Sequence, residues 1–210
     1  MILPAILFII FASLITNAVS YLQVEKDLSE LFFIFPFLYL GAAIMGVFVT
    51  ALLRWIIIGK YSPAKKPLWC SYVWRSELVT GVYENFMVLF ILNILTGTPF
   101  IKYPLRLLGC KIGKKTCFFT TQITEFDLIK IDDYSVMNDN CTLQTHLFED
   151  RVMKMSFVDI GKECSVGGMA VVLYDSKMRN RSILEPLSVL MKSETLPANT
   201  SFIGAPATKI

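Results

Sequence analysis

The stretch from residue 160 to the C-terminus carries a six-residue repeat that restricts the fold more than any other feature of this sequence. An amphipathic helix repeats its apolar residues every three or four positions and an ordinary strand every second position, so neither explains a strict six. The residue four places after each repeat position is mostly small. The repeat positions themselves run without one slip through Ile160, Val166, Val172, Met178, Leu184, Leu190, Leu196 and Phe202. This pattern predicts a left-handed parallel β-helix, in which each side of a triangular coil takes about six residues and points one bulky side chain inward.

The repeat begins faintly upstream and is interrupted twice. Ile112 and Phe118 are in phase, the register then breaks, and it resumes over Ile131, Met137 and Leu143 before breaking again ahead of residue 160. Interruptions in a solenoid are the places where loops leave the coil, and such loops commonly carry function. The second interruption contains the sequence LQTHLFEDRVMKM. We therefore expect the functional loop of the domain there.

The N-terminal half reads as a membrane region. Hydrophobic residues make up 54% of the chain, which is high for a soluble domain and points to long apolar spans. Two uncharged runs predict transmembrane helices over about 2–22 and 31–53. A cleaved signal peptide is the alternative for the first run, and the absence of a basic segment before it makes that alternative the weaker one. The predicted fold class is thus membrane helices followed by an all-β domain, divided into 1–101 and 102–210.

A third apolar run, predicted as a helix over about 78–97, lies at the margin between a span and an interfacial or re-entrant helix. Basic residues dominate the segments on both sides of it, so a crossing would break the positive-inside rule on one side. This placement favours a helix that dips into the membrane and returns, and it leaves the β-helix facing the cytosol of an inner or plasma membrane. The same basic residues predict contact with anionic membrane lipid.

Charge and cysteine content exclude several function classes. Twenty basic residues against seventeen acidic ones give a net charge of +3, too weak a bias for nucleic-acid binding. The five cysteines are odd in number and form no CxxC pair, so they read as reduced packing residues. One histidine without ligand spacing predicts no metal site and no bound cofactor.

His146, the single histidine, lies in the second interruption and is the candidate catalytic base. A side chain that exchanges a proton near neutral pH suits the attack of an amine or hydroxyl on a thioester. Glu149 and Asp150 lie near enough in sequence to orient its ring. The alternative is that His146 only covers the edge of a coil.

A second set of candidate residues lies near the C-terminus. Lys192 and the closing turn Gly204, Ala205 and Pro206 could line a groove for the pantetheine of an acyl donor. For these residues a turn and cap is the alternative role.

Several tracts of the chain resemble a known family. LLRWIIIGKY, PLWCSYVWR, LRLLGCKIGK, LQTHLFEDRVMKM and LSVLMKSETLPANTSFIGAPA together look like the C-terminal membrane region of nonribosomal peptide synthetases of the ε-poly-L-lysine synthetase type. The resemblance covers about residue 31 to the end. Within it the β-helix is similar to hexapeptide-repeat acyltransferases, whose terminal GxPA is matched by Gly204, Pro206 and Ala207.

The resemblance implies acyl or aminoacyl transfer from acyl-CoA or a phosphopantetheinyl carrier, with His146 as the base. It also implies a homotrimer and, because the chain contains no adenylation or carrier domain, a carrier or adenylation domain of a peptide synthetase as partner. A catalytically inactive module that docks or oligomerises a synthetase at the membrane is the competing function. A polar pocket around His146 would favour the enzyme, and a histidine in apolar packing would favour the module.

Overall fold

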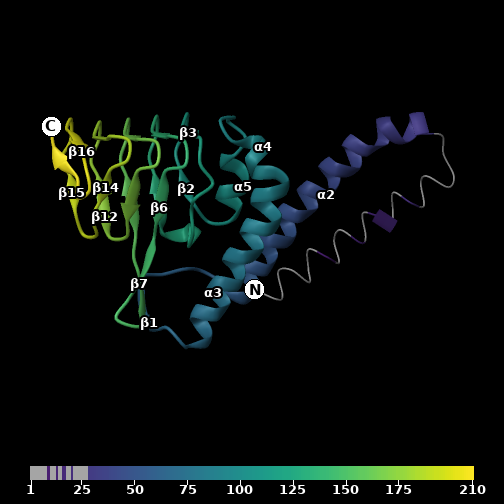
Figure 1. Cartoon of the computed structure of the whole chain (residues 1–210), viewed down its shortest axis with the longest axis horizontal. Helices are drawn as coiled ribbons and strands as arrows, with labels where there is room; N and C mark the ends of the chain where they lie inside the picture. The colour runs from purple at the N-terminus through teal and green to yellow at the C-terminus, as the bar shows by residue number, and fades with distance from the viewer. Residues whose placement is uncertain (1–8, 10–12, 14–15, 18–19, 21–27) are drawn as a thin grey trace.

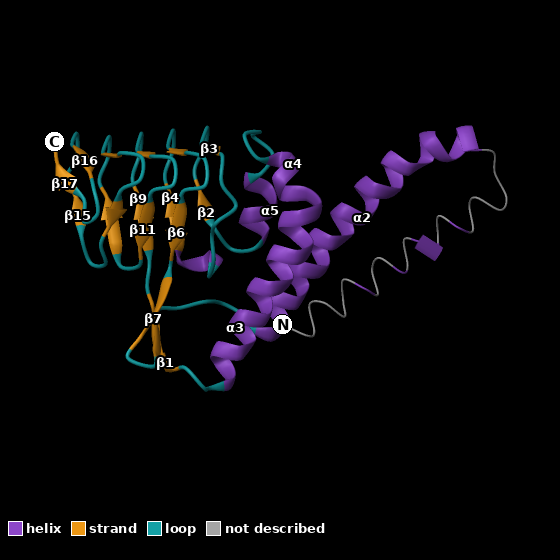
Figure 2. Ribbon diagram, in the orientation of Figure 1, coloured by secondary structure: helices purple, strands orange, loops and turns teal. Residues whose placement is uncertain are grey.

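The computed structural model describes residues 9, 13, 16–17, 20 and 28–210. The helix expected over 2–22 therefore lies almost entirely outside the described residues. In the described part, a bundle of helices packs against one end of a long β-helix, and the C-terminus lies at the far end of that β-helix (Figure 1). The secondary structure divides the chain in the same way, with helices in the N-terminal half and short strands in the C-terminal half (Figure 2).

The helical part holds two long helical runs. Two stretches are long and apolar enough to cross a membrane, Phe33–Ile57 and Ser71–Leu95, each of 25 residues. A short helix, α5, then leads into the first coil of the β-helix. The elements are α2 (Leu28–Ile57), α3 (Ser71–Val82), the π-helical η1 (Tyr83–Leu92), α4 (Asn93–Leu95) and α5 (Lys102–Leu107).

The second helical run differs from the expected helix over 78–97. It begins earlier than expected, at Ser71. Arg75 and Glu77 interrupt the apolar run in the sequence, but both lie on an exposed side of the helix and do not break it. The elements α3, η1 and α4 follow one another without a gap up to Leu95.

The β-helix is formed by three parallel sheets, one along each side of the coil. The sheet orders are β2-β4-β9-β12-β15, β3-β5-β10-β13-β16 and β6-β11-β14, with β17 added antiparallel to the last strand of the second sheet. The strands are β2 (Lys111–Ile112), β3 (Cys117–Phe118), β4 (Ile129–Ile131), β5 (Val136–Met137), β6 (Thr142–Gln144), β9 (Val158–Ile160), β10 (Ser165–Val166), β11 (Val171–Leu173), β12 (Ser176–Met178), β13 (Ile183–Leu184), β14 (Val189–Leu190), β15 (Thr195–Leu196), β16 (Ser201–Ile203) and β17 (Thr208–Lys209).

The strand register confirms the six-residue repeat. Val166 lies beside Leu184, which lies beside Phe202, so each coil takes three hexads. The repeat residues from 160 to 196 are all buried and fill the interior. The second break in the sequence pattern corresponds to extra residues in one coil. Ile131 pairs with Ile160 in the next coil, so the coil between them is eleven residues longer than a regular one. Those extra residues form the loop expected to carry function.

A buried ion pair joins the helices to the β-helix. Arg54, fully buried at the end of α2, contacts the carboxylate of Asp127 in the 3-10 helix η2 (Phe126–Leu128). The same carboxylate accepts a hydrogen bond of 2.8 Å from the backbone N–H of Tyr61. Gly109 packs over it with φ +114°, and a Cβ at that position would lie 2.5 Å from Asp127 Oδ1. The membrane-type helices and the first coils thus form one packed unit with a shared apolar core.

Candidate active site

The extra residues of the long coil form a β-hairpin that projects toward the helices. Its strands are β7 (His146–Glu149) and β8 (Val152–Met155), paired antiparallel with His146 opposite Met155. On its other edge β8 pairs with β1 (Ala64–Pro67), from the segment between the two long helical runs. Figure 1 shows β7 and β1 at the side of the β-helix, next to α3, and His146 is the first residue of β7.

His146 is bonded to a buried carboxylate. Its Nδ1 lies 2.7 Å from Oε2 of Glu125, whose side chain is inaccessible to solvent. The hydroxyl of Thr145 donates to the same Oε2 at 2.6 Å, and the hydroxyl of Ser76 in α3 donates to Oε1 at 3.3 Å. Glu125 is itself held in a left-handed backbone conformation, φ 39°, just before η2. These contacts fix the ring's orientation and leave Nε2 as its free nitrogen.

The histidine and the carboxylate stabilise each other's charged forms. Burial disfavours the imidazolium, but the hydrogen bond and negative charge of Glu125 outweigh burial and raise the pKa of His146. Burial also disfavours the charged form of Glu125. The hydrogen bond from His146, its positive charge and the hydroxyls of Thr145 and Thr124 outweigh burial and lower the pKa of Glu125. Neutral His146 is consequently a stronger base than free imidazole, and Glu125 stays ionised near neutral pH.

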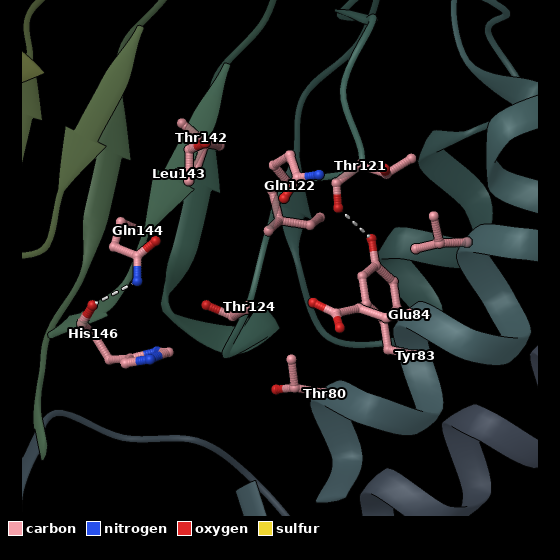
Figure 3. Close-up of a pocket in the computed structure, with 12 residues that line it drawn as sticks. Thr80, Tyr83, Glu84, Thr121, Gln122, Thr124, Thr142, Leu143, Gln144 and His146 are labelled. Atoms are coloured by element: carbon pink, nitrogen blue, oxygen red, sulfur yellow. Dashed lines mark hydrogen bonds between the residues drawn. The ribbon is translucent and has the colours of Figure 1, made fainter. Parts of the chain in front are cut away.

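A cavity of about 460 Å³ opens beside this pair. It lies between η1 on one side and β6 with the segment preceding η2 on the other (Figure 3). His146 is 7% exposed, and its ring points into the cavity, where Nε2 has no hydrogen-bond partner among the described residues (Figure 3). The polar lining residues are Thr80, Tyr83, Glu84, Thr121, Gln122, Thr124, Thr142 and Gln144. A buried imidazole that is oriented by a carboxylate and faces a polar cavity can accept a proton from a bound group.

Glu149 and Asp150, which we expected to orient the ring, lie elsewhere. Glu149 is three residues from His146 on the same strand, and residues an odd number apart point to opposite faces. Its carboxylate instead pairs with Lys154 at 3.1 Å and with Lys192 at 2.6 Å, contacts that lower the pKa of Glu149. Asp150, at the hairpin's exposed tip, pairs with Lys154 at 3.1 Å. The orienting role falls to Glu125, while Glu149 holds the hairpin against later coils through Lys192.

The turn Gly204–Ala205–Pro206 lies at the end of the β-helix, between β16 and β17. The backbone N–H of Gly204 donates to Ser188 Oγ at 2.9 Å, and its carbonyl accepts from Val189 at 2.9 Å. The turn therefore continues the sheet β6-β11-β14 beyond β14. It lies three strand positions away from β6, the strand that leads into His146. At the usual strand spacing this separation is about 14 Å. The structure brings Lys192 to Glu149 but does not bring either of them, or this turn, into the cavity beside His146.

Sequence reasoning missed Glu125, Ser76 and Glu84. Glu125 lies 21 residues before His146, in the first interruption of the hexad repeat, and that interruption is the only sequence signal that could have drawn attention to it. Ser76 and Glu84 lie in the second helical run. Glu84 falls within the membrane helix predicted over 78–97, and Ser76 lies before it. Only the packing of that helix against the coils brings them to the site.

Comparison with known proteins finds one close sequence relative and several folds of the same type. No known family profile matches the chain. The chain is 43% identical over 159 residues to the delta-poly-L-ornithine synthetase of Acinetobacter baumannii (strain AB307-0294), a match that covers 76% of this chain and 12% of that synthetase. The chain thus spans a small part of its relative's length.

Two solved structures are similar to this chain at low sequence identity. One is the serine acetyltransferase of Neisseria gonorrhoeae, with a TM-score of 0.47 and 14% identity over 80% of this chain and 53% of that chain. The other is a hexapeptide-repeat acetyltransferase of Vibrio cholerae O1 biovar eltor in complex with acetyl coenzyme A. It has a TM-score of 0.44 and 18% identity over 57% of this chain and 81% of that chain.

Proposed function

We propose that this chain is a membrane-anchored acyltransferase of peptide synthesis, which transfers an acyl or aminoacyl group from a CoA or carrier thioester to an amine or hydroxyl. The observation that carries the proposal is the His146–Glu125 pair. Nδ1 is bonded at 2.7 Å to a buried carboxylate while Nε2 faces a polar cavity, which is the arrangement expected of a general base. A histidine that only covered a coil edge would need neither the buried carboxylate nor the cavity.

The similarity to a poly-L-ornithine synthetase supports an amine as the acceptor. A polymer named for its δ linkage is made by repeated acylation of a side-chain amine, and the shared region accounts for 76% of this chain. We extend the proposal of an amine acceptor to the resemblance with synthetases of the ε-poly-L-lysine type, which build the same kind of bond. The donor we propose is an aminoacyl thioester presented by a carrier domain, with acyl-CoA as the simpler donor of the same chemistry.

In the proposed reaction Nε2 of His146 removes a proton from the attacking amine as its nitrogen forms a bond to the thioester carbon. Glu125 stabilises the imidazolium that results, through the Nδ1 bond and its negative charge. The C–S bond then breaks, and the imidazolium returns the proton to the leaving thiolate. The products are an amide and a free thiol, and His146 ends neutral. Thr145 and Ser76 keep Glu125 in place throughout by bonding both of its oxygens.

The remaining expectations about location and assembly form part of the same proposal. The helix α2 crosses the membrane, the second helical run is interfacial or re-entrant, and the β-helix faces the cytosol, where it contacts anionic lipid through the basic segments. The pairing of β1 with β8 supports this, because it keeps the segment before the second run beside the β-helix. The donor's pantetheine lies along the face of the β-helix that ends at the turn 204–206, near Lys192. A homotrimer would cover the outer sides of the coils, and a carrier or adenylation domain of a synthetase would supply the thioester.

The test is acyl transfer by the full chain reconstituted in nanodiscs. L-Ornithyl-S-pantetheine and acetyl-CoA serve as donors and L-ornithine as acceptor, with thiol release and amide mass as readouts. We expect transfer by the wild type and a loss of about 10²- to 10⁴-fold in His146→Ala, the usual effect of removing a general base. Arg151→Ala, at the exposed hairpin tip, is the matched control and should transfer at the wild-type rate.

A second variant separates catalysis from folding. His146→Ala leaves the buried charge of Glu125 without its main partner, so that variant alone could unfold. His146→Asn keeps an N–H donor near the position of Nδ1 but offers no base, and we expect it to fold, as thermal unfolding would show, and to be inactive. Wild-type rates in the folded Asn variant would remove His146 as the base, and the docking module would then be the better description.

A further inference from the structure

Glu84 is the charged residue of the second helical run that faces the cavity. The run Ser71–Leu95 contains three charged residues, Arg75, Glu77 and Glu84, of which only Glu84 lines the cavity. Its carboxylate points into the cavity from η1 while the ring of His146 points in from the opposite wall (Figure 3). It has no hydrogen-bond or ion-pair partner among the described residues. Glu84 is exposed to solvent, so its negative charge is available to a cation that enters the cavity.

His146 independently indicates that the cavity holds a ligand. Its side chain is nine-tenths buried, its Nδ1 is occupied by Glu125, and its Nε2 faces the cavity unpartnered in the described structure. The cavity volume of about 460 Å³ falls in the range of small-molecule sites. Hydroxyls of Thr80 and Thr124 line the space that both groups face (Figure 3). The helical wall thus offers an anion and the hydroxyl of Thr80, and the opposite wall offers a base beside the hydroxyl of Thr124.

We propose that Glu84 binds an ammonium group of the acceptor and so selects acceptors that carry two amines. This inference rests on the proposed function. It adds the residue that determines which amines the site accepts. An amine held by a carboxylate stays protonated and cannot attack a thioester, because its lone pair is occupied. The ammonium that pairs with Glu84, aided by the hydroxyl of Thr80, is therefore the group that does not react. The second amine of the same molecule is then presented to Nε2 of His146.

This arrangement determines which end of a diamine is acylated. An acceptor with a single amine gains nothing from Glu84, since pairing with the carboxylate and attacking the donor require the same nitrogen. An acceptor with two amines can use both walls of the cavity at once. Glu84 accordingly acts as a specificity-determining residue and not as a base.

The first experiment compares two acceptors of equal length, 1,4-diaminobutane and n-butylamine, with acetyl-CoA as donor. We expect the wild type to prefer the diamine by at least tenfold in kcat/KM. We expect Glu84→Gln to abolish that preference by raising KM for the diamine, so that the ratio of kcat/KM for the two acceptors falls to about one. A general folding defect would lower both acceptors alike. Glu77→Gln, which removes the same charge from the same helix at a position that does not line the cavity, is the control. Because the charge of Glu77 also raises the pKa of His146, this variant should change the rates with both acceptors alike and keep the preference.

The second experiment measures binding without turnover. Calorimetry of 1,4-diaminobutane with the full chain in nanodiscs should show binding that weakens at least tenfold in Glu84→Gln, whereas the uncharged 1,4-butanediol should not bind measurably. Loss of transfer with diamine binding intact would overturn the proposed function and leave the ammonium site standing. Equal diamine binding by the wild type and Glu84→Gln, or an unchanged acceptor preference, would overturn the assignment of Glu84.

Discussion

Replacing Glu125 with glutamine should change the pH dependence of the reaction as well as its rate. The negative charge of Glu125 raises the pKa of His146 against the opposing effect of burial. Glutamine keeps the size of the side chain and removes the charge, so burial then dominates and the pKa of His146 falls below its usual value. Because a base works only in its neutral form, the acidic limb of the pH–rate profile should move to lower pH in Glu125→Gln. The rate at the plateau should fall, since the imidazolium loses its counter-charge.

The hydrogen bonds of Glu125 also determine how much the free energy of unfolding should fall in this variant. Oε2 accepts two charge-assisted hydrogen bonds, from Thr145 at 2.6 Å and from His146 at 2.7 Å. A glutamine can place its oxygen there and its amide N–H groups toward Ser76 Oγ, so the bonds persist as neutral ones. Each bond then weakens from about 1.5–3 to about 1 kcal/mol, which gives a total loss of about 2 kcal/mol.

The pH window of that loss follows from the directions of the two pKa shifts. Glu125, with its lowered pKa, contributes stability above its unfolded pKa and loses it as the solution becomes acidic. His146, with its raised pKa, contributes stability below its unfolded value near 6.5, and this contribution is lost as pH rises through the raised value. The destabilisation should therefore be largest between about pH 5 and 6.5 and smaller at pH 9.

Two measurements on nanodisc-reconstituted protein test this reasoning, a pH–rate profile with acetyl-CoA and L-ornithine, and thermal unfolding at pH 6 and pH 9. Glu149→Gln is the matched control, because Glu149 pairs with Lys154 and Lys192 and has no contact with the ring. Its acidic limb should coincide with that of the wild type. An unshifted acidic limb in Glu125→Gln, with the protein folded, would refute the claim that Glu125 tunes the base.

Two further predictions concern the joint between the helices and the β-helix. Asp127→Ala leaves fully buried Arg54 without a counter-ion, and we expect a loss of about 3–5 kcal/mol, seen as a lower Tm in detergent. A Tm equal to that of the wild type would show that the pair contributes nothing. Gly109→Ala places a Cβ 2.5 Å from Asp127 Oδ1 at φ +114°, so it should cost at least about 2 kcal/mol, whereas Gly46→Ala, with open space around it, should be neutral or slightly stabilising. Equal unfolding temperatures for the two glycine variants would contradict this.

The β-helix could be predicted from the sequence because its determinants repeat locally. Each coil needs one bulky residue per side at a spacing of six, and the residues from Ile160 to Leu196 satisfy that requirement without information from distant segments. The loop that carries His146 was found for the same reason, since extra residues interrupt a regular register. Helical length and apolar composition likewise indicated the run over 31–53, which falls within α2 and is long and apolar enough to cross a membrane.

The partner of His146 could not be predicted in this way. Sequence distance suggested Glu149 and Asp150, but the alternation of a strand points Glu149 to the opposite face from His146, toward Lys192. Glu125 reaches the ring because the coil closes and brings residues 21 positions apart into contact at 2.7 Å.

The cavity depends on tertiary structure still more strongly. Its base comes from a hairpin in the β-helix and its free carboxylate, Glu84, from a helix about sixty residues earlier in the chain. The sequence by itself thus determined the repeating scaffold and the place where it is interrupted, because both follow from short-range periodicity. Only the packing of the helices against the coils decided which charged groups meet at the site, because that packing joins segments that no local pattern links.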